Sequence, residues 1–113
     1  MLQTNLEHVT SKEALQKLID SNEKVAVCCG RMGPMCIPVY EVFEIFREKY
    51  PDIQFRVMEF DSPDAVAIKE LPECRGFRGL PFTVYYRNGK VVKATTSIQD
   101  AKQIKDIISE VFA

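Results

Sequence analysis

Residues 24–36, KVAVCCGRMGPMC, decide the fold, because a buried strand, a tight loop and the start of a long helix follow one another there. The run 24–29 is apolar after its first lysine, which is typical of a central strand buried on both faces. Gly30 to Pro34 predicts a loop, and Pro34 suits the first position of a helix. The segment therefore predicts a central strand that leads through a short loop into a helix ending near Tyr50.

Helical spacing gives that helix a wide apolar face. The predicted face comprises Val39, Tyr40, Val42, Phe43, Ile45 and Phe46. Outside this region, helix-capping residues, turn residues and the alternation of apolar and polar residues predict the remaining elements. They are a strand within 3–9, a helix capped by Thr10 and Glu13, a strand around Ile53 to Val57, a helix opened by Ser62 and ending near Leu71, two strands joined by Asn88-Gly89, and a last helix capped by Ser97 or Asp100.

The predicted order is β-α-β-α-β-α-β-β-α. Crossover helices connect the first three strands, so those strands should be parallel, whereas the last two form an antiparallel hairpin. The sequence thus predicts an α/β fold with a mixed central sheet flanked by helices. A length of 113 residues suits a single domain over 1–113.

Composition narrows the classes of function. The chain is 27% charged with a net charge of -1, so bulk electrostatics favour neither nucleic acid nor an anionic membrane as a partner. The sequence has no run of 18 apolar residues, and its first residues do not resemble a secretory leader. We therefore expect a cytoplasmic protein, and no pattern predicts a cofactor.

The order of elements resembles the thioredoxin family over nearly the whole chain. Gly33-Pro34 at the mouth of the long helix lies where that family carries Trp-Cys-Gly-Pro-Cys. The segment Gly79-Leu80-Pro81 before the hairpin looks like the family's Gly-Ile-Pro, in which the proline is cis. The resemblance therefore implies a thioredoxin-like fold, a role in redox homeostasis and a cis Leu80–Pro81 bond.

Three departures from the family fall on its reactive site. In the simplest register the two family cysteines fall on Met32 and Met35, the tryptophan on Arg31, and the buried aspartate on Ala26. A thioether has no acidic proton, so it can neither attack a disulfide nor close one. The ordinary dithiol reaction is therefore not expected at this site.

The remaining surface suggests a binding module. By resemblance, the backbone before the cis proline pairs with an extended segment of a partner protein or peptide, which is a form of strand addition. Exposed methionine beside it would supply an adaptable apolar contact. The candidate binding residues are Arg31, Met32, Gly33, Pro34, Met35, Leu80 and Pro81.

Two alternatives remain open at this stage. Cys36 is expected in the first turn of the long helix, where the helix dipole favours a thiolate. It would act alone through a mixed disulfide, or resolve an attack by Cys29 if their Cα atoms approach within about 7 Å. In the other alternative, five sulfurs in nine residues would bind Cu(I), those of Cys28, Cys29, Met32, Met35 and Cys36. Because such methionines more often fill core gaps, no metal ligand is assigned.

Overall fold

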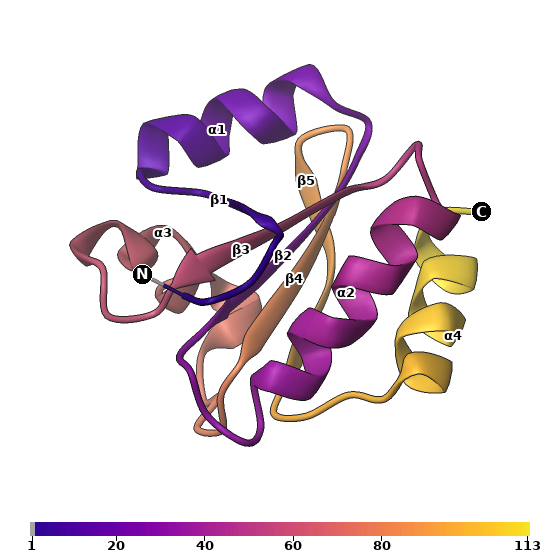
Figure 1. Ribbon diagram of the computed structural model, residues 1–113. Coiled ribbons are helices and arrows are strands. Elements are labelled where there is room, and N and C mark those ends of the chain that lie inside the picture. Colours follow the sequence, from indigo (N-terminus) through magenta and orange to yellow (C-terminus); the bar gives the residue numbers. More distant parts are fainter. Residues whose placement is uncertain (1) are drawn as a thin grey trace.

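The computed structural model describes residues 2–113. These residues form a five-stranded mixed sheet with helices on both faces (Figure 1). The strand order is β1-β3-β2-β4-β5. The first three strands along the chain are mutually parallel, whereas β4 pairs antiparallel with β2 and β5 pairs antiparallel with β4. The predicted fold class, order and strand directions are confirmed. The elements are β1 (Glu7–His8), α1 (Lys12–Ser21), β2 (Lys24–Gly30), α2 (Ile37–Lys49), β3 (Gln54–Glu59), α3 (Val66–Lys69), β4 (Phe82–Arg87), β5 (Lys90–Thr96) and α4 (Ala101–Val111).

Local signals placed some boundaries correctly. Asn88 and Gly89 both have positive φ, 54° and 81°, as a two-residue hairpin turn requires. Asp100, not Ser97, caps α4, and its side chain and that of Gln103 form a capping box. Within residues 2–113, no helix combines the length and the apolar character needed to cross a bilayer.

Other boundaries were wrong. The cap of α1 is Ser11, whose hydroxyl accepts from the Ala14 N–H at 3.0 Å, and not Thr10. The first strand has only two residues, because the chain before it bonds to a helix instead of the sheet. The Thr4 hydroxyl and the Asn5 N–H both donate to the Glu44 carboxylate of α2, at 2.6 and 3.0 Å.

The predicted third helix is broken into short pieces. α3 has four residues, and single 3-10 turns, Pro63–Ala65 and Pro72–Cys74, lie before and after it. Ser62 does open the segment, since its hydroxyl accepts from the Asp64 N–H at 3.2 Å. Pro72 prevents a longer helix, because the residue before a proline avoids helical geometry.

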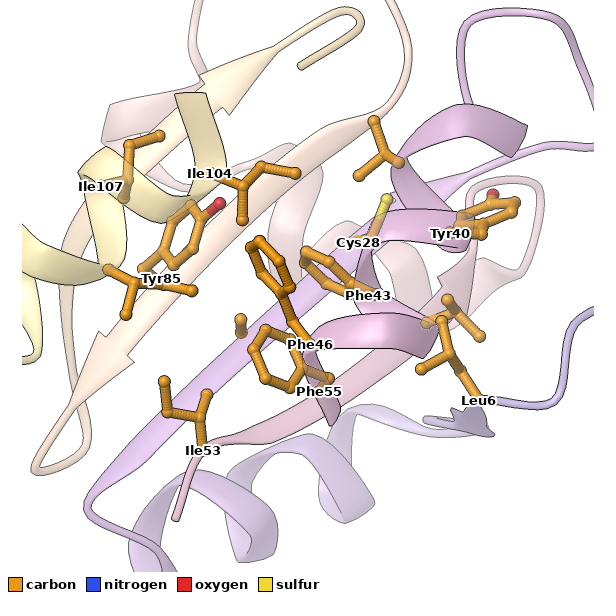
Figure 2. Close-up of a cluster of buried hydrophobic side chains, with 14 of the residues drawn as sticks. Leu6, Cys28, Tyr40, Phe43, Phe46, Ile53, Phe55, Tyr85, Ile104 and Ile107 are labelled. Atoms are coloured by element: carbon orange, nitrogen blue, oxygen red, sulfur yellow. The ribbon is translucent and has the colours of Figure 1, made fainter. Parts of the chain in front are cut away.

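Two apolar clusters fill the faces of the sheet. α2 and α4 cover one face and α1 and α3 cover the other (Figure 1). In the first cluster the rings of Phe43 and Phe55 pack edge to face with centroids 5.0 Å apart (Figure 2). Ile45, predicted on the buried face of α2, is 65% exposed, because two residues along a helix turn a side chain about 200° away from Phe43.

The buried hydroxyl of Tyr85 lacks a hydrogen-bond partner. Tyr85 is fully buried, and Figure 2 shows its hydroxyl directed toward Ile104. Because a buried unpaired hydroxyl is costly, Tyr85→Phe should raise the free energy of unfolding by about 1 kcal/mol in urea denaturation. Tyr40→Phe is the matched control and should lower it by about 1 kcal/mol, since the Tyr40 hydroxyl donates to the Arg31 carbonyl at 2.9 Å. Equal losses in both variants would contradict the assignment.

Candidate functional site

The loop after β2 is held by a turn at Gly33. The Gly33 carbonyl accepts from the N–H groups of Cys36 and Ile37, at 3.1 and 3.0 Å. The regular helix begins at Ile37 and not at Pro34, because Pro38 has no N–H to donate to the Pro34 carbonyl. Cys36 is therefore the residue before the helix instead of lying within its first turn.

Both methionines of the loop face solvent. Met32 is 44% and Met35 42% exposed, so neither fills a gap in the core. The Gln3 N–H donates to the Met32 sulfur at 3.2 Å. Ala26, the position of the family's buried aspartate, is completely buried in β2. The site thus presents two thioethers at the surface above an apolar strand.

Cys36 lies beneath the loop. Its side chain is 2% exposed, and its sulfur accepts from the Arg31 N–H at 3.4 Å. The Tyr40 hydroxyl crosses the same space to donate to the Arg31 carbonyl. A partner disulfide would need the loop to open before it could reach this thiol.

The other three cysteines are also buried and free. Cys28 and Cys29 point to opposite faces of the sheet, so Cys29 lies in the cluster under α1 and α3, whereas Cys36 lies under α2. The alternative in which Cys29 attacks and Cys36 resolves is therefore not supported, because the two free thiols lie in different clusters. The five sulfurs expected to converge on Cu(I) are likewise divided by the sheet. No three His, Cys, Asp or Glu side chains among residues 2–113 form a metal-binding group.

Burial also suppresses thiol reactivity. It raises the pKa of Cys29 to about 12 and that of Cys74 to about 11, and it raises the pKa of Cys28 as well. Iodoacetamide should therefore modify the native protein at least about tenfold more slowly than free cysteine at pH 8, and label all four thiols after unfolding. Mass spectrometry of the labelled protein measures both. Rapid native labelling of Cys36 would instead support its role as a nucleophile.

Arg31 makes an ion pair that the sequence analysis missed. Its guanidinium donates two hydrogen bonds of 2.8 Å to the Asp61 carboxylate, which lowers the pKa of Asp61. The guanidinium carbon also lies 5.2 Å from the ring centroid of Phe60. A topological signal was present, because Arg31 follows β2 and Asp61 follows its parallel neighbour β3, and such strand ends meet at one edge of a sheet.

The segment before β4 meets the loop at Gly30. The Leu80–Pro81 bond is cis, the isomer predicted from the sequence. A Cβ atom on Gly30 would lie 3.1 Å from the Cβ of Pro81, so the segment and the end of β2 are in close contact. The Gly79 carbonyl accepts from the Thr96 hydroxyl and from the Ser97 N–H, the latter at 3.2 Å.

Leu80 has a free backbone. Within residues 2–113 neither its N–H nor its carbonyl makes a hydrogen bond, although Gly79 and Pro81 on either side both accept one from Ser97. Its side chain is half-buried between the two clusters. The backbone N–H and carbonyl of Leu80 are thus available to pair with an extended segment.

Solved structures with a similar arrangement include several thioredoxins. No protein-family model matches the sequence, and no curated protein matches it. Thioredoxin from Plasmodium falciparum is 23% identical with a TM-score of 0.77, over 94% of this chain and 99% of its own. A mutant thioredoxin from Halobacterium salinarum is 24% identical at 0.76, over 92% and 88%. Mitochondrial thioredoxin 3 from Saccharomyces cerevisiae is 19% identical at 0.76, over 94% and 95%. The chain therefore has the thioredoxin fold.

Proposed function

We propose that this chain binds an extended segment of a partner protein at the Met32–Leu80 surface, which consists of residues 31–35 with Leu80 and Pro81. We further propose that it does not catalyse ordinary dithiol–disulfide exchange. The observation that carries the binding proposal is the unpaired N–H and carbonyl of Leu80, in the segment that meets the end of β2 at Gly30, together with the exposure of Met32 and Met35. Thioethers at 32 and 35, and the burial of all four thiols, support the second part.

The surface suits strand addition. An extended segment that pairs with Leu80 gains two main-chain hydrogen bonds, and these bonds demand no particular partner sequence. Flexible methionine side chains adapt to different apolar residues. The Arg31–Asp61 pair at the edge contributes little attraction, because each charge is already neutralised by the other.

Two experiments test the proposal separately. In an insulin-disulfide assay with thioredoxin reductase, the chain should give no turnover above background, because no exposed dithiol is present. Sustained turnover would refute the non-catalytic part and leave the binding part standing.

Peptides selected from a random library should test the binding part. Met32→Asp with Met35→Asp should weaken their binding at least about tenfold, since two charges replace apolar contacts. Ile45→Asp, at an exposed position on the outer face of α2, is the control and should leave binding unchanged. The Leu80 amide should also exchange with deuterium quickly in the free protein and slowly in the complex. Selected peptides that do not protect this amide would count against the surface.

A further inference from the structure

We propose that a cleft between α1, α3 and the β4–β5 hairpin binds a small, mainly apolar molecule with one hydrogen-bond acceptor, to which the Tyr86 hydroxyl donates. The cleft measures about 580 Å³, within the range of small-molecule sites. It shares no residue with the Met32–Leu80 surface, so it stands independently of the proposed function.

Apolar side chains from three elements line this cleft. α1 contributes two of them, the α3 region two, and β5 one. They are Leu15, Ile19, Ala67, Leu71 and Val91. The two helices that border the cleft, α1 and α3, cover the face of the sheet opposite α2 and α4 (Figure 1). Such a lining favours the transfer of an apolar molecule from water.

Tyr86 supplies the polar group. Its side chain is 3% exposed and lines the cleft from β4, and its hydroxyl makes no hydrogen bond with any of residues 2–113. Burial raises the pKa of Tyr86, so the phenol keeps its proton at neutral pH and acts as a donor. The hydroxyl is not among the sealed, unpartnered polar atoms, so it is open to the cleft and free to donate to a carbonyl or ether oxygen on a bound molecule.

The charges at the cleft favour a neutral ligand. Lys12 and Glu13 of α1 both line it and carry opposite charges, and Gln16 beside them is uncharged. An anion or a cation would therefore meet one repulsive group for each attractive one. The ligand class is thus a neutral molecule with an aliphatic or aromatic body and one acceptor.

A matched pair of probes tests this inference. 4-Phenylbutan-2-one carries a carbonyl acceptor, and butylbenzene has a similar apolar body without one. In titrations followed by amide NMR shifts, both should perturb the residues that line the cleft, and the ketone should bind more tightly. Tyr86→Phe should weaken the ketone about three- to tenfold and leave butylbenzene unchanged.

Two further variants complete the design. Tyr85→Phe removes a hydroxyl sealed in the opposite cluster and should not change binding of either probe. Ala67→Phe fills the cleft and should abolish binding of both, with urea denaturation as the check of folding. Shifts away from the cleft, an absence of binding at millimolar probe, or equal effects of Tyr86→Phe on both probes would overturn the proposal.

Discussion

Replacing Gly30 with alanine is expected to lower the free energy of unfolding by about 2–3 kcal/mol, and the melting temperature by about 10 °C. The added Cβ would lie 2.7 Å from the Tyr40 oxygen, 2.8 Å from the Cys36 sulfur and 3.1 Å from the Cβ of Pro81. The Tyr40 oxygen is held by its bond to the Arg31 carbonyl, and Pro81 is a rigid ring. Neither of these two groups can therefore move aside cheaply.

Gly33→Ala is the matched control three residues away. No atom outside its neighbours lies within 4 Å of a Cβ at Gly33, and its φ is not positive. The variant should change stability by less than about 0.5 kcal/mol, or raise it slightly by restricting the unfolded chain. Urea denaturation of both variants gives the comparison. Similar stabilities would show that the loop and the Pro81 segment do not meet at Gly30.

Sequence reasoning succeeded where the signal is local. The Asn88-Gly89 turn and the Asp100 cap depend on backbone conformations that a few neighbouring residues determine. It failed where a residue distant in the sequence competes for the hydrogen bonds of a predicted element. The predicted strand within 3–9 shrank to Glu7–His8 because Glu44, far along the chain, takes the hydrogen bonds of Thr4 and Asn5. Such competition leaves no trace in a local pattern.

At the candidate site, too, features set by nearby residues were predicted and features set by distant packing were not. The exposure of Met32 and Met35 followed from their place in a loop before a long helix. The burial of Cys36 did not, because it depends on how Gly30, Tyr40 and the loop backbone close over the sulfur. A cysteine beside a helix start can face either solvent or core, and only packing decides between them.

The largest change in activity is expected from restoring thiols at the two exposed loop positions. Met32→Cys with Met35→Cys should raise insulin-disulfide reduction, with dithiothreitol as reductant, at least about tenfold above background. Both positions are exposed, and both lie just before the N-terminus of α2, whose dipole favours a thiolate. Turbidity of precipitating insulin measures the rate.

The single variants separate a dithiol cycle from a lone thiol. Met32→Cys alone can attack insulin but depends on dithiothreitol to release the mixed disulfide, so its rate should stay well below that of the double variant. Met32→Leu with Met35→Leu removes the sulfurs without adding thiols and should match the starting protein. Ala26 should limit the rate of insulin reduction by the double variant, because β2 offers no buried carboxylate to take the proton of the resolving thiol. If the double variant were as inactive as the leucine control, methionine at 32 and 35 would not be the reason the dithiol reaction is absent.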